Sequence, residues 1–118
     1  MGRIRNKPWE TGLAENTHIL FFSDHGDMHG SHGMFLKTHP YEESLRIPFV
    51  IGGASHYTGV TRARVDYPIN HVDIAPTTLG LCGIRPPEWM QGTDYSAARL
   101  GGTVQNAARS IGALHFAA

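Results

Sequence analysis

Apolar and polar positions along the chain predict short strands and helices that are joined by polar loops. Residues Thr17–Ser23 are mostly apolar, β-branched and aromatic, without alternation, which is typical of a strand buried on both faces, as in a parallel sheet. A second apolar run, Phe49–Ile51, follows Pro48 and stops at a pair of glycines, so it predicts another short buried strand. With the helix expected after them, these strands indicate an α/β fold.

The same pattern predicts two helical segments. Residues 1–16 form a weak segment that Pro8 interrupts, because proline fits best in a first helical turn. Asp73 is a favourable N-cap for a second helix, which is expected to run to about Cys82 and to stop at Gly83. Cys82 is expected to be a buried, inert thiol, because its neighbours on this helix are apolar.

The remaining segments are predicted from their glycine, proline and polar content. Residues 24–40 form a loop, residues 41–46 a single helical turn and residues 54–64 a surface loop. A short extended piece, broken by a proline, is expected over residues 65–72. The tail 97–118 is small, polar and weakly periodic, so no element is assigned to it.

Length and charge limit the classes of function. The 118 residues suit one small domain. Ten basic and ten acidic residues cancel, so net charge favours neither nucleic acid nor an anionic membrane as a partner. No apolar run reaches the length of a membrane span, no secretory signal is visible, and the single Cys82 excludes an intramolecular disulfide. The compartment stays unknown on this evidence.

Candidate chemistry is concentrated directly after the first predicted strand. Five side chains able to bind a metal ion or carry a proton fall within nine residues, namely Asp24, His25, Asp27, His29 and His32. Carboxylates and imidazoles supply hard and borderline metal ligands, and the glycines among them let the backbone turn tightly. These residues predict a metal site at the mouth of the strand. A histidine-rich zinc module using Asp24, His25, His29 and His32 is a weaker alternative.

Three segments of the chain resemble the sulfatase family, within the alkaline-phosphatase-like superfamily of metal-dependent ester hydrolases. The first comprises Ser23-Asp24-His25-Gly26, Gly30-x-His32-Gly33 and Lys37; the second is Tyr41–Ile51; the third is Asp73–Leu79 with Gly83-Ile84 and Met90-Gln91-Gly92. They follow the family's order and spacing over roughly positions 12–96. The resemblance implies a partial sulfatase-like catalytic domain over residues 1–96, folded as part of an alkaline-phosphatase-like sandwich with parallel-sheet strands and flanking helices.

The resemblance also implies roles for individual residues. Asp24 and His25 match the family's late metal ligands, and calcium is the ion that the family favours, although His25 also suits manganese or zinc and the carboxylate suits magnesium. Lys37 matches the lysine that contacts the sulfate oxygens, and His32 belongs to the family's His-Gly pair beside the substrate. Without the resemblance, Asp24 would cap a turn, and His25 and Lys37 would be ordinary surface residues.

The implied reaction is hydrolysis of a sulfuric ester, in a small molecule or a sulfated glycan. A phosphodiesterase or phosphonate monoester hydrolase of the same superfamily is the alternative. The family's Cys/Ser-x-Pro-x-Arg nucleophile segment and its first pair of metal-binding aspartates are absent from this sequence. The chain is therefore expected to be a portion of such an enzyme or an inactive truncated product, prone to self-association through an exposed sheet edge.

Overall fold

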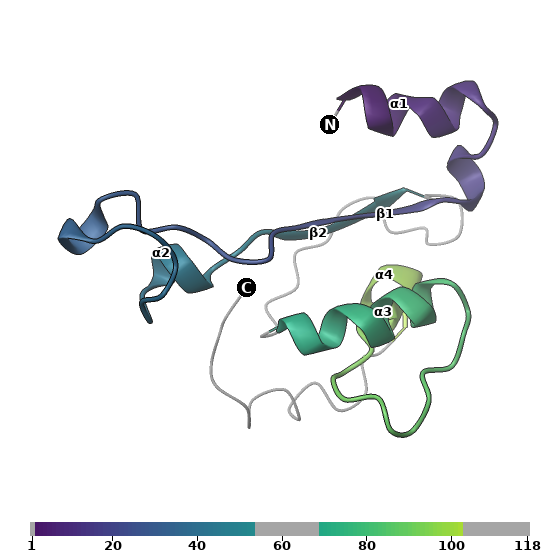
Figure 1. Ribbon diagram of the computed structural model, residues 1–118. Helices are drawn as coiled ribbons and strands as arrows, with labels where there is room; N and C mark the ends of the chain where they lie inside the picture. Colours follow the sequence, from purple (N-terminus) through teal and green to yellow (C-terminus); the bar gives the residue numbers. More distant parts are fainter. Residues whose placement is uncertain (1, 54–68, 103–118) are drawn as a thin grey trace.

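The computed structural model describes residues 2–53 and 69–102 (Figure 1). The elements in chain order are helix α1 (Gly2–Glu10), 3-10 turn η1 (Ala14–Asn16), strand β1 (His18–Phe22), 3-10 turn η2 (Ser31–Gly33), helix α2 (Glu42–Leu45), strand β2 (Phe49–Gly53), 3-10 turn η4 (His71–Asp73), helix α3 (Ile74–Leu81) and helix α4 (Ser96–Leu100). The loop predicted over 54–64, most of the extended piece over 65–72 and the tail from 103 onward lie outside the described residues.

The two strands form an antiparallel pair in which Leu20 lies opposite Ile51 and Phe22 opposite Phe49. The expected parallel pairing is therefore wrong for these strands. A parallel pair needs a crossover connection, usually a helix that packs on the sheet, whereas the connection here holds only the short turn η2 and the four-residue α2 and returns the chain antiparallel beside β1. The strand is also not buried on both faces, since Phe21 is 42% exposed.

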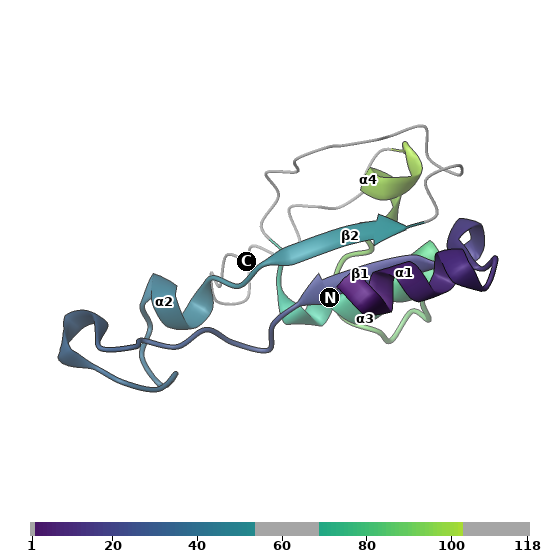
Figure 2. The ribbon, with the colours of Figure 1, turned by 90° about the horizontal axis from the view of Figure 1, so that it is seen from above.

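The α/β class itself is as predicted, because helices flank the small sheet. Helices α3 and α4 lie on one side of the strands, and the loop after β1 extends with α2 beyond the end of the hairpin (Figures 1 and 2). Helix α1 forms where the weak segment was expected, runs through Pro8 and has no buried residue. None of the described helices is long and apolar enough to cross a membrane.

Helix α3 has the predicted start and extent. It ends at Leu81, and Gly83 takes the left-handed backbone that stops it, with φ 70°. Asp73 occupies the N-cap position of α3, as predicted, but its side chain makes no cap hydrogen bond to this helix. The carboxylate instead accepts from the Asn70 amide at 2.8 Å, in a capping box that closes the preceding turn η4.

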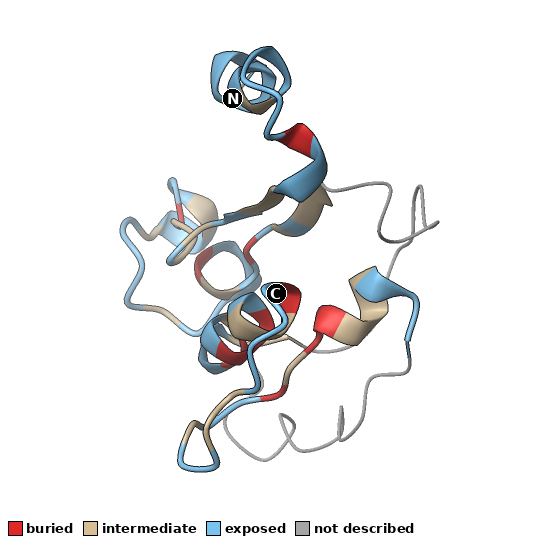
Figure 3. Ribbon diagram, turned by 90° about the vertical axis from the view of Figure 1, so that its right-hand side faces the viewer, coloured by how far each residue is buried: buried red, intermediate tan, exposed pale blue. Residues whose placement is uncertain are grey.

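The packed core lies between α3 and α4, and Figure 3 shows buried segments on both helices. Thr77 and Tyr95 are almost fully buried, and the Tyr95 amide donates to the Thr77 hydroxyl at 3.0 Å. Asp73 is 0% exposed and accepts from the Thr93 amide at 2.7 Å, so this carboxylate joins the start of α3 to the segment before α4. Cys82 is exposed, contrary to prediction, because it follows the last buried turn of α3.

Candidate functional site

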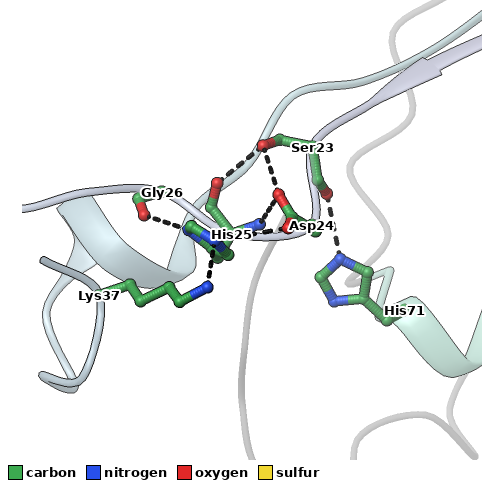
Figure 4. A network of polar contacts seen from close by, with 6 residues as sticks. All are labelled: Ser23, Asp24, His25, Gly26, Lys37 and His71. Carbon is green, nitrogen blue, oxygen red and sulfur yellow. Dashed lines mark hydrogen bonds and ion pairs between the residues drawn. The ribbon is translucent and has the colours of Figure 1, made fainter.

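Strand β1 leads directly into the turn that carries Asp24 and His25 (Figure 4). The Ser23 hydroxyl donates to the His25 carbonyl at 2.7 Å, and the His25 amide donates to Asp24 Oδ1 at 3.0 Å. Neighbouring side chains on a strand point to opposite faces, but this hydrogen-bonded turn bends the chain. It therefore brings the two side chains together.

Gly26 fixes the far side of this turn against α2. Its amide donates to the Ser44 carbonyl at 2.8 Å. A Cβ atom at this position would overlap the carbonyl oxygen of Glu43, so only glycine allows so close an approach of the two backbones. The turn is thus held by β1 on one side and by α2 on the other.

The His25 ring is held in one tautomer by its two neighbours. Nδ1 donates to the Gly26 carbonyl at 2.7 Å, since a carbonyl oxygen can only accept. Nε2 lies 2.6 Å from Lys37 Nζ, and an ammonium group can only donate. His25 Nε2 therefore carries no proton, and its lone pair accepts the hydrogen bond from the Lys37 ammonium.

The Asp24 carboxylate completes this arrangement. Its Oδ2 lies 3.4 Å from His25 Nε2, and its side chain is 84% exposed. The hydrogen bond from its own backbone amide lowers the pKa of Asp24, as do the positive charge of His25 at the acid pH where Asp24 titrates and the ammonium of Lys37. Asp24 is thus ionised at neutral pH. Its Oδ2 and the Nε2 atom of His25 both carry lone pairs and lie close together.

The structure brings three of the predicted site residues together and places the fourth elsewhere. Asp24, His25 and Lys37 converge, although Lys37 lies twelve residues from His25. The His32 ring instead stacks on Tyr41, with ring centroids 4.3 Å apart and planes at 19°. His32 Nε2 lies 3.8 Å from Glu43 Oε1, so His32 belongs to a contact between the loop tip and α2.

The grouping required for a histidine-rich zinc module does not form. The His29 side chain is 87% exposed, and its Nδ1 lies 3.6 Å from Asp27. Across residues 2–53 and 69–102, no group of three or more His, Cys, Asp and Glu side chains is placed to hold a metal ion. The prediction of a shared site for Asp24, His25, His29 and His32 is therefore not met in this part of the chain.

One residue near the site was not predicted from the sequence. His71 Nε2 lies 3.1 Å from the Ser23 carbonyl oxygen and donates to it, across 48 positions of sequence. A single histidine outside any spacing pattern gives no signal of its own. Its place two residues before Asp73, at the start of the third matched segment, was the available clue.

Comparisons with known proteins agree with the resemblance in the sequence. The Sulfatase family model matches residues 1–84. The chain is 44% identical over 89 residues to an ulvan-active sulfatase of Formosa agariphila, which covers 72% of this chain and 17% of that protein. It is 40% identical over 93 residues to an arylsulfatase of Clostridium perfringens, which covers 78% of this chain and 19% of that protein.

A solved structure shows the same relationship in three dimensions. It is that of BT4656 in complex with its substrate D-glucosamine-2-N,6-O-disulfate, with a TM-score of 0.66 and 29% identity. The match covers 89% of this chain but 21% of that one, so the chain spans about a fifth of these relatives. The family model matches most of the sequence, and the solved structure has a similar fold. The chain therefore belongs to the sulfatase family.

Proposed function

We propose that this chain forms the part of a sulfuric ester hydrolase that holds a divalent cation and contacts the sulfate group. Asp24 and His25 are the cation ligands, and Lys37 is the sulfate contact. The observation that carries the proposal is the convergence of Asp24 Oδ2, His25 Nε2 and Lys37 Nζ, with 3.4 Å and 2.6 Å between successive atoms. Family membership supplies the reaction class.

The residues fit a divalent cation. Asp24 offers an ionised, exposed carboxylate, and His25 offers a lone pair whose tautomer is fixed by a backbone carbonyl, as is usual for a ligating histidine. Calcium and magnesium prefer the carboxylate, whereas manganese and zinc also accept the imidazole, and calcium is the leading choice by family. Two ligands are too few for such a cation, so further ligands complete its coordination.

The chemistry that such a cation supplies is polarisation of the sulfate oxygens and activation of a nucleophile. The residues of this chain bind and orient. Lys37 carries an ammonium group on a flexible stem, so it can hold a sulfate oxygen and stabilise the charge that develops on the leaving oxygen. His25 keeps this ammonium at the site before an anion arrives. His32, on Tyr41, is proposed to shape the loop beside the substrate.

The proposed substrate is a sulfated glycan or a smaller sulfate ester. The relatives that support this are the ulvan-active sulfatase and BT4656, which binds a sulfated sugar. The Cys/Ser-x-Pro-x-Arg segment is absent from this sequence, so the 118-residue chain alone is expected to bind without hydrolysis. Turnover of an aryl sulfate or a phenylphosphonate ester above the level of an Asp24→Asn variant would contradict this expectation.

Titration of the chain with calcium chloride and manganese chloride, followed by calorimetry, tests the cation site. Asp24→Asn keeps the shape of the side chain and removes its charge, so binding is expected to be lost. Asp27→Asn makes the same change in the same loop, where the carboxylate pairs with His29 instead, and is expected to leave binding intact. Equal binding by the wild-type chain and Asp24→Asn would remove the proposal.

A further inference from the structure

We infer that His71 is a positioning residue for the Asp24–His25 pair. Its hydrogen bond to the Ser23 carbonyl holds the turn on which both side chains stand. The inference rests on the proposed function, because it concerns the cation site assigned there. It adds to that site a residue from a different part of the chain, beyond Asp24, His25 and Lys37.

Ser23 is the residue through which His71 acts (Figure 4). Its carbonyl accepts from His71 at 3.1 Å, and its hydroxyl donates to the His25 carbonyl at 2.7 Å and lies 3.4 Å from Asp24 Oδ1. The carbonyl belongs to the peptide plane between Ser23 and Asp24. Holding this plane sets the direction in which the Asp24 side chain leaves the backbone.

His71 is itself held firmly, although its ring is exposed. It begins the turn η4, which the Asp73 carboxylate closes by accepting from the Asn70 amide. Asp73 is fully buried and also accepts from the Thr93 amide, so the turn is anchored to the α3–α4 core. Hydrogen bonds from the buried Asp73 carboxylate thus fix the backbone turn that carries His71, and the His71 ring in turn holds the Ser23 carbonyl beside the cation ligands.

The alternative reading is that His71 only ties two segments together. The two readings differ in what a substitution changes. An exposed hydrogen bond contributes little net free energy of unfolding, because water replaces it readily. A residue that orients a metal ligand has a larger effect on metal affinity, typically about 10- to 100-fold. Affinity and stability measured on the same variants therefore separate them.

The test uses three substitutions in the full chain. Glutamine at position 71 places an amide nitrogen close to where Nε2 lies and can still donate, whereas asparagine is one methylene shorter and alanine has no donor. His71→Ala and His71→Asn are expected to weaken calcium and manganese binding about tenfold or more. His71→Gln is expected to stay within about threefold of the wild-type chain. Urea midpoints should agree among all of them.

His39→Ala is the matched control, since His39 lies in the same loop as Lys37 and its side chain makes no hydrogen bond within the described residues. It is expected to bind as the wild-type chain does. Should His71→Ala fail to fold, the asparagine and glutamine variants still give the comparison, because both keep a polar side chain of similar volume.

Three outcomes count against the inference in different ways. Unchanged affinity in both His71→Ala and His71→Asn, alongside lost binding in Asp24→Asn, overturns the positioning role and leaves the proposed function standing. Binding by His71→Gln that is as weak as by His71→Ala also overturns it, since a donor then makes no difference. Unchanged binding in Asp24→Asn removes the cation site, and this inference with it.

Discussion

Lys37 donates a hydrogen bond to the ring of His25, with Nζ 2.6 Å from Nε2. The lone pair on Nε2 that would bind a divalent cation is the lone pair that now accepts from the ammonium. One lone pair serves one partner at a time. A cation that takes this position therefore releases Lys37, and the released ammonium is then available for a sulfate oxygen.

Lys37→Met is accordingly expected to strengthen cation binding while it removes anion binding. The substitution takes away both a competitor for Nε2 and a like charge, so we expect calcium affinity to rise roughly fivefold at low ionic strength. The Lys37→Met variant should also no longer bind added sulfate. Calorimetric titration in 20 mM and 200 mM salt would check this, with Lys7→Met in α1, where Lys7 pairs with Glu10, as the control. Weaker calcium binding by Lys37→Met would contradict the competition.

Gly26→Ala is expected to distort the site. The added Cβ would overlap the Glu43 carbonyl oxygen, so the turn must move away from α2 and lose its hydrogen bond to Ser44. We expect a loss of about 2 kcal/mol in the free energy of unfolding and a large loss of cation affinity. Gly52→Ala is the control, because a Cβ there meets open space. Wild-type affinity in Gly26→Ala would show that the contact is not required.

Asp73→Ala is expected to be among the most damaging single changes. It leaves the Asn70 and Thr93 amides without the buried carboxylate that they share. Unsatisfied buried donors next to a lost network cost about 3 kcal/mol in the free energy of unfolding. Urea denaturation measures this loss, with the exposed Glu88→Ala as control. A loss well under 1 kcal/mol would argue against a structural role for this carboxylate.

The contact between the loop tip and α2 predicts a dependence on pH. The Ser31 hydroxyl donates to Glu43, and with the backbone amide and nearby His32 it lowers the pKa of Glu43 below its ordinary value of 4.5. A lowered pKa means that the contact stabilises the fold fully above pH 4.5 and is lost as the pH falls through the lowered value. Ser31→Ala should raise the pKa of Glu43 in a carboxyl NMR titration, whereas Thr38→Ala should not.

The exposed sheet predicts self-association at high concentration. Phe21 and Val50 lie opposite one another and are 42% and 56% exposed. Unpaired strand edges with apolar side chains pair readily with other chains. Val50→Lys should therefore shift sedimentation velocity profiles toward the monomer, whereas Ile84→Lys, an equally exposed position away from the strands, should not. A concentration-independent monomer for the wild-type chain would contradict this.

The parts of the fold that sequence predicts well are those set by local chemistry. The end of α3 follows from Gly83, and the resemblance to the sulfatase family pointed to Asp24, His25 and Lys37, which the structure brings together. The direction of strand pairing was missed, because an apolar run reports burial and not the direction of its neighbour. The apolar pattern also overstated the burial of the first strand, since Phe21 is 42% exposed.

The hydrogen-bond partners of the Asp73 and His71 side chains were not predicted from the sequence, for a common physical reason. Each acts through a partner distant in sequence, since Asp73 accepts from Thr93 and His71 donates to Ser23. Local propensity ranks Asp73 as a cap and is silent about His71. Only the packing of α3 against α4 and of η4 beside β1 shows what these side chains contact.

The antiparallel pairing of β1 and β2 has one more consequence. Because the strands neighbour each other in sequence, the whole stretch from Asp24 to Lys37 is a single excursion from one hairpin. Both cation ligands and the lysine are therefore connected to the rest of the fold through the same two strands. The hydrogen bond from His71 comes instead from outside the hairpin, so it would stretch or break if the hairpin moved. The presence of this hydrogen bond therefore reports whether the hairpin is packed against the rest of the fold.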